Sequence, residues 1–143
     1  MSKVHLAVNC FRSGLNCSQA ILSTYCEEYG LDKRTALKLA CGFGGGMGRL
    51  GKTCGAVTGA YLVIGLACGN HRKDDNEAKE KTYALVQAFD KAFAERNQST
   101  DCRRLLGFDL LSNVGSKEKE RVNRVCPQMV RDAAEILESI LNL

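Results

Sequence analysis

Apolar residues recur at helical spacing along most of the chain, whereas the alternating pattern of a β-strand is scarce. A long helix is predicted from Glu77 to about Arg96. Its expected core-facing stripe consists of Tyr83, Val86, Phe89 and Phe93. No internal repeat, linker or low-complexity tract interrupts the pattern. These features predict a single all-α domain spanning residues 1–143, a compact bundle of about six or seven helices.

A second apolar stripe predicts a C-terminal helix, with Val130, Ala133, Ala134, Leu137, Ile140 and Leu141 on its buried face. The only proline, Pro127, precedes this stripe. Proline is favoured at the first position of a helix, so we expect the helix to begin there with Cys126 as its N-cap. A separate short helix is expected from Glu118 to about Val125.

Capping residues predict where other helices start. Asn16 is followed three residues later by Gln19, which is the pattern of a capping box and makes Cys17 the first helical residue. Asp32 is expected to cap a third helix. Asp101 caps a compact helical turn that begins with Cys102 and stops at Gly107.

The stretch 41–69 joins a glycine-rich loop to an apolar helix, which we expect to be central. Thr53 is a suitable N-cap, which would make Cys54 the first helical residue. Gly55 and Gly59 share a helix face, so another backbone or a cofactor can approach closely there. The residues expected to contact a cofactor are Gly44, Gly45, Gly46, Arg49, Lys52 and Gly55.

The charge and the amino-acid composition exclude some classes of function and favour others. The net charge is +4, there is no tryptophan and no basic run, so nucleic acid is not an expected partner. The start of the chain has no signal-peptide pattern, and the apolar run 60–67 is too short for membrane insertion. We therefore expect a cytoplasmic protein, where structural disulfides are rare. Its eight cysteines then indicate metal or redox chemistry.

The cysteines divide into two sets by predicted position. Cys17, Cys54, Cys102 and Cys126 fall at helix N-termini, where the helix dipole favours a thiolate. The other four fall in last helical turns, where we expect protonated, packed thiols: Cys10, Cys26, Cys41 and Cys68. Helix ends that meet at one end of a bundle would bring the first set together. Such a site suits an iron–sulfur cluster, zinc or a pair of exchanging disulfides.

One motif indicates a different chemistry. Residues 46–53, GMGRLGKT, satisfy the P-loop pattern and predict phosphate binding through Gly46–Thr53. A working P-loop follows a buried strand, but the segment from Thr35 to Cys41 reads as helix. Conversely, no CxxC pair is present, which argues against a thioredoxin-like site and a simple zinc ribbon.

Four blocks of the chain resemble one known family over nearly its whole length. They are the segments NCSQA at 16–20, CGAVTG at 54–59, CRRLLG at 102–107 and CP at 126–127. In this order they are similar to the redox-active C_GCAxxG_C_C proteins, although the chain has Cys54-Gly55-Ala56 where the family label has Gly-Cys-Ala. The resemblance implies that Cys17, Cys54, Cys102 and Cys126 are the four characteristic cysteines. The family is also similar to the non-haem part of split-Soret cytochrome c, which implies an iron–sulfur site.

The leading hypothesis is a redox-active protein or oxidoreductase component in which these four cysteines bind an iron–sulfur cluster for electron transfer with a redox partner protein. The alternatives are a thiol–disulfide oxidoreductase without a cofactor, in which Cys54 is the nucleophile, then a structural zinc module, then P-loop nucleotide binding. A homodimer is left open.

Overall fold

The computed structural model describes all residues 1–143 and contains helices and 3₁₀ turns but no β-strand, which confirms the all-α prediction. Seven regular helices are present, in agreement with the sequence. The elements are α1 Val4–Arg12, α2 Cys17–Tyr25, η1 Cys26–Tyr29, α3 Lys33–Ala40, η2 Cys41–Phe43, α4 Gly44–Met47, α5 Gly55–Cys68, α6 Asn76–Asn97, α7 Cys102–Leu106 and α8 Ser116–Leu141. The α4 segment is irregular, because Gly45 and Gly46 inside it are left-handed.

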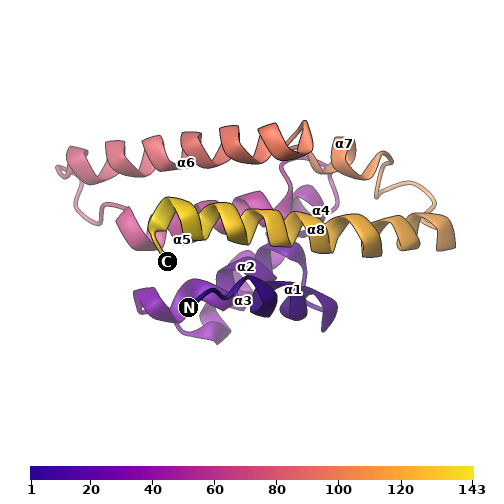
Figure 1. Cartoon of the computed structure of the whole chain (residues 1–143), viewed down its shortest axis with the longest axis horizontal. Helices are drawn as coiled ribbons and strands as arrows, with labels where there is room; N and C mark the ends of the chain where they lie inside the picture. The colour runs from indigo at the N-terminus through magenta and orange to yellow at the C-terminus, as the bar shows by residue number, and fades with distance from the viewer.

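Helix α5 is the central helix of the bundle, as the sequence predicts. It contacts α2, α6 and α8, and its residues 55–60 are all buried. Helix α8 crosses the middle of the molecule, antiparallel to α6 on one side, while α1, α2 and α3 lie on the other side (Figure 1). The apolar α5 therefore has packing partners around most of its circumference.

The glycine face of α5 allows a close contact with a neighbouring helix. Helices α2 and α5 pack most extensively against one another. A Cβ atom on Gly59 would lie 2.9 Å from the carbonyl oxygen of Ser18, and one on Gly55 would lie 3.2 Å from the Cβ of Cys17. The expectation that another backbone approaches this face is confirmed, and it brings the start of α2 against the start of α5.

The predicted caps on α2 and α3 are present. The N–H of Gln19 donates to Asn16 Oδ1 at 2.9 Å, and the N–H of Asn16 donates to Gln19 Oε1 at 3.1 Å. The N–H of Thr35 donates to the Asp32 carboxylate at 2.9 Å. Each cap satisfies an N–H that has no partner within its helix, so both helix starts are fixed.

Two predictions about the long helices are wrong. Helix α8 is continuous from Ser116, so Cys126 is not an N-cap and no separate helix 118–125 exists. Tyr83 is 54% exposed, because the buried face of α6 is confined to Phe89 and Phe93 near its C-terminal end. Packing against α5 and α6 keeps α8 helical past its proline. Helix propensity along the sequence does not include this packing, so it could not predict the continuous helix.

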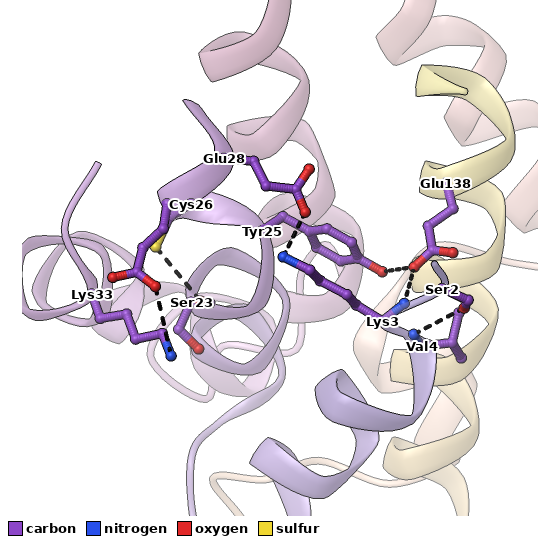
Figure 2. A network of polar contacts seen from close by, with 10 residues as sticks. Ser2, Lys3, Val4, Ser23, Tyr25, Cys26, Glu28, Lys33 and Glu138 are labelled. Atoms are coloured by element: carbon purple, nitrogen blue, oxygen red, sulfur yellow. Dashed lines mark hydrogen bonds and ion pairs between the residues drawn. The ribbon is translucent and has the colours of Figure 1, made fainter. Parts of the chain in front are cut away.

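A polar network joins the beginning of the chain to the end of α8 (Figure 2). The hydroxyl of Tyr25 donates to Glu138 Oε2 at 2.5 Å, and the N–H of Lys3 donates to the same oxygen at 2.8 Å. The Lys3 ammonium pairs with Glu28 at 2.6 Å. Burial, together with the bond to Glu138, raises the pKa of Tyr25. This network fixes α1 and α2 relative to α8.

None of the helices combines the length and the hydropathy needed to cross a membrane.

A candidate redox site lined by five cysteines

A cavity of about 490 Å³ lies between α2, the α4 loop, α5, α7 and α8. The four cysteines of the first set, Cys17, Cys54, Cys102 and Cys126, all line it. Cys17, Cys54 and Cys102 are buried, and Cys126 is half-buried. Residues separated by more than a hundred positions thus meet around one space, which is the convergence expected from the sequence.

Cys17 reaches the cavity as the first residue of α2. The capping box described above fixes this start, and the side-chain amide of Asn16 also donates to the carbonyl of Cys41 at 3.0 Å. Gly44 lies directly against Asn16, because a Cβ there would be 2.5 Å from Asn16 Nδ2. The capping residue therefore ties the α2 start to the glycine-rich loop.

A short antiparallel pairing holds Cys54 beside Cys102. The N–H of Cys54 donates to the carbonyl of Thr100, and the N–H of Cys102 donates to the carbonyl of Lys52, both at 2.7 Å. Thr53 forms an isolated β-bridge with Asp101 and is not the cap of α5. Cys54 is itself the N-cap, one residue before the position we expected. Cys54 has φ −52° and ψ 135°, which are not helical values, so the first helical residue is Gly55 and not Cys54.

Cys126 lies inside α8, next to Pro127. Proline has no backbone N–H, so position 127 cannot donate to the carbonyl of Asn123, and its ring crowds that carbonyl. An interior proline costs about 3 kcal/mol relative to alanine. Pro127 is buried in the bundle, directly after a cysteine that faces the cavity. The missing N–H leaves the carbonyl of Asn123 without its usual helical partner in the part of α8 that lines the cavity.

The glycine-rich loop forms one wall through an unusual backbone conformation. Five successive residues, 45–49, have positive φ, including Met47 at 70° and Arg49 at 68°. Left-handed backbone costs a residue other than glycine about 1–2 kcal/mol. Gly46 is required for a second reason, because a Cβ on it would lie 2.7 Å from the Cβ of Cys102. Strain of this kind is retained where the surroundings fix a functional geometry.

The residues predicted to contact a cofactor are placed in two groups. Five of them line the cavity, namely Gly44, Gly45, Gly46, Arg49 and Gly55. Lys52 does not line it and is exposed. Arg49 is the only charged residue of the lining, so the cavity has a positive charge and no carboxylate.

The ionisation of the thiols differs from the expectation. Interaction with the neighbouring Cys126 thiol, followed by burial, raises the pKa of Cys17, and the same interaction lowers the pKa of Cys126. Burial raises the pKa of Cys54 to about 12, although the N–H groups of Ala56 and Val57 oppose this. Burial also raises the pKa of Cys102 to about 11. The prediction of four acidic thiols is therefore wrong for three, because desolvation outweighs the helix dipole.

The donor set has the chemistry of a soft-metal site but not the geometry of a single-ion site. The four thiols line one largely apolar cavity, and thiolates are the ligands of iron–sulfur clusters. No group of three histidine, cysteine or acidic side chains is arranged to hold one metal ion. A structural zinc site needs four ligands closed around one ion. The type of donor therefore suits a cluster, whereas the arrangement does not match a closed four-ligand zinc site.

The P-loop alternative is wrong. The segment before Gly46 is helical and the chain has no sheet, so the strand that presents a P-loop is missing. The backbone N–H groups of Gly51 and Lys52 are already bonded to the carbonyls of Gly45 and Gly46. The loop folds back on itself and does not cradle a phosphate.

Two features of the site escaped the sequence analysis. Cys41, which we expected to pack like an apolar residue, is exposed and lines the cavity as a fifth thiol. The rest of the wall is apolar and includes Phe11, Leu110, Val122 and Met129. The position of Cys41 next to the loop was the one available signal for the first feature. No local pattern predicts the second, because its residues come from distant segments.

The fold and the cavity thus define an all-α protein built around a multi-thiol centre. A model of the family described as "Putative redox-active protein (C_GCAxxG_C_C)" matches residues 15–140, which is most of the chain. The protein belongs to this redox-active family. Comparison with curated proteins and comparison with solved structures both find no match.

Proposed function

We propose that this protein is an electron-transfer protein in which Cys17, Cys54, Cys102 and Cys126 bind an iron–sulfur cluster. The observation that carries the proposal is the meeting of these four thiols, from four different helices, around one cavity. When bound, such a cluster accepts and donates single electrons. We place this activity in the cytoplasm, since all eight cysteines are free thiols.

Other groups of the chain affect the deprotonation of the four thiols and the charge of the centre. The thiols must lose their protons to bind metal, and burial opposes this loss at Cys17, Cys54 and Cys102. The lowered pKa of Cys126 makes it the first thiolate available. The N–H groups of Ala56 and Val57 stabilise negative charge on the Cys54 sulfur. Arg49 supplies the positive charge that offsets a negatively charged centre in an apolar cavity.

A second function is supported by one observation. The thiols of Cys17 and Cys126 line the same cavity, and their interaction shifts their pKa values in opposite directions. An acidic thiol beside a protonated one is the arrangement of a dithiol that cycles to a disulfide. In this alternative Cys126 is the attacking thiolate, in place of the Cys54 that we expected.

The experiment that separates the functions is purification without air, followed by iron, acid-labile sulfide and zinc analysis and a visible spectrum. The cluster proposal predicts a brown protein with iron and sulfide in matching amounts. A colourless protein that loses its thiols in pairs on mild oxidation would support the disulfide function. Stoichiometric zinc without sulfide would contradict both.

A further inference from the structure

The surface around the mouth of the cavity is basic and carries an exposed apolar residue. Arg49, Leu50 and Lys52 of the glycine-rich loop are exposed, and Leu50 has 57% of its surface accessible. The side chains of Arg103 and Arg104 in α7 are 64% and 80% exposed. We call these five residues the mouth surface.

Backbone and side-chain contacts make this a single surface. The N–H of Arg103 donates to the carbonyl of Gly51 at 3.1 Å, and a Cβ on Gly51 would lie 3.1 Å from the Cβ of Arg103. The loop and α7 are therefore in direct contact. Because the same two segments carry Cys54 and Cys102, the mouth surface lies immediately outside the thiol centre.

The charge of the mouth surface is only partly compensated. Asp101 and Asp109 approach Arg104 and Arg103 at 3.9 Å, which is the outer limit of an ion pair. Arg49 and Lys52 have no ion-pair partner among all salt bridges of the structure. Arg49 and Lys52 also have no acidic residue near them in sequence. The segment 33–73 contains seven lysines and arginines and no aspartate or glutamate.

We propose that the mouth surface docks an acidic electron-carrier protein. The proposal rests on the proposed electron-transfer function and names the partner of that same site. Unpaired positive side chains attract and orient a negatively charged protein. An exposed apolar side chain among them adds apolar surface that is buried in the transient complex. One electron passes from the reduced carrier to the centre, so the carrier is oxidised by one electron, the centre is reduced by one, and no atom is transferred.

The chemistry of the surface favours a protein over a nucleic acid. Base stacking needs exposed aromatic side chains, and the mouth surface has none. Its cations lie on two short segments around a cavity and not along a stripe that follows a phosphate backbone.

The test measures binding of an acidic plant-type [2Fe–2S] ferredoxin to the full chain at low and at high salt. The double variant Arg103→Glu/Arg104→Glu is expected to bind about tenfold more weakly at low salt and to lose most of the salt dependence. The matched control Arg72→Glu/Lys73→Glu carries the same charge change at the other end of α6, which at 22 residues is about 33 Å long (Figure 1). The affinity of this control variant for ferredoxin should differ from that of the wild type by less than about twofold.

Lys52→Glu is a third variant, since Lys52 is exposed and outside the cavity lining. It should weaken ferredoxin binding even if the α7 variant does not fold, which circular dichroism reports. The proposal is overturned if the wild type does not bind ferredoxin, if the α7 and control variants weaken binding equally, or if single-stranded DNA binds more tightly than ferredoxin. Iron and sulfide are measured on every variant. A protein that holds its cluster but does not dock refutes this inference alone, whereas one that docks without a redox centre refutes the proposed function alone.

Discussion

The thiols of Cys17, at the start of α2, and Cys126, in the middle of α8, line the same cavity, and their interaction shifts their pKa values in opposite directions. The two residues come from opposite ends of the chain. Cys17 directly follows the capping residue of α2, and Cys126 directly precedes the proline of α8.

Mild oxidation of the metal-free protein should form the Cys17–Cys126 disulfide first. The two thiols line the same cavity and influence each other's pKa, and the lowered pKa of Cys126 supplies the thiolate. Peptide mapping by mass spectrometry after diamide treatment checks this. In the chain-entropy account, a disulfide that closes about 100 residues stabilises the fold by about 4–5 kcal/mol. Cys68→Ser should leave the reaction unchanged, and a different first pair would contradict the assignment.

The reduced, metal-free protein should lose stability above about pH 9. The folded-state pKa of Cys54 is raised from 9.0 to about 12, so its contribution is fully present below pH 9 and is lost as pH rises toward 12. Each such thiol changes the free energy of unfolding by at most about 1.4 kcal/mol per pH unit in this window. Tyr25 and Tyr61, whose pKa values are also raised, add to the slope of the wild type.

The comparison of Cys54→Ser with the wild type isolates the thiol. Urea unfolding from pH 8 upward should show that the free energy of unfolding falls less steeply with pH in the variant. The difference in slope should correspond to at most one bound proton. Parallel curves for the two proteins would show that Cys54 is not desolvated as the structure indicates.

Two glycines of the loop form a matched pair for testing its geometry. Both Gly46 and Gly48 have positive φ, but a Cβ on Gly46 would lie 2.6 Å from the N of Lys52, whereas one on Gly48 meets nothing within 4 Å. Gly48→Ala should therefore cost about 1–2 kcal/mol from backbone strain alone. Gly46→Ala should cost a further 1–3 kcal/mol, roughly, from the clash. Urea unfolding measures both, and equal costs would contradict the close approach of the loop to α7.

Pro127→Ala should stabilise the protein and impair the site. The change restores the N–H that α8 lacks at this position, which is worth up to about 3 kcal/mol, less what the loss of the buried ring costs. The backbone next to Cys126 would also change, and we expect this to weaken the interaction of Cys126 with Cys17. Thermal unfolding and the yield of the Cys17–Cys126 disulfide check the two effects. A variant that is stabilised and forms the disulfide at the wild-type rate would show that the proline has no part in the site.

The features predicted correctly from sequence are those set by local chemistry. The capping box at Asn16, the cap at Asp32 and the glycine face of α5 each depend on residues within one helical turn. The all-α class followed from the same short-range patterns. Helix ends also picked out four of the five cysteines that line the cavity, although Cys126 lies inside α8 and not at a helix N-terminus.

The features that could not be predicted depend on contacts between distant segments. The pairing of residues 51–54 with 100–103 moves the start of α5 by one residue and brings Cys54 to Cys102. The packing of α8 against the bundle keeps it helical across Pro127. Burial, which exists only in the folded chain, reverses the expected acidity of Cys54.

The most direct test of the account is anaerobic reconstitution of six proteins with iron and sulfide: the wild type, the four single cysteine-to-serine variants at positions 17, 54, 102 and 126, and Cys68→Ser as the control outside the cavity. Visible absorbance and acid-labile sulfide per chain are the readouts. The account predicts full loading of the wild type and Cys68→Ser, and loss of most or all of the cluster in each of the other four. A wild type that takes up no sulfide, or a Cys68→Ser variant that loses as much cluster as Cys54→Ser, would contradict it.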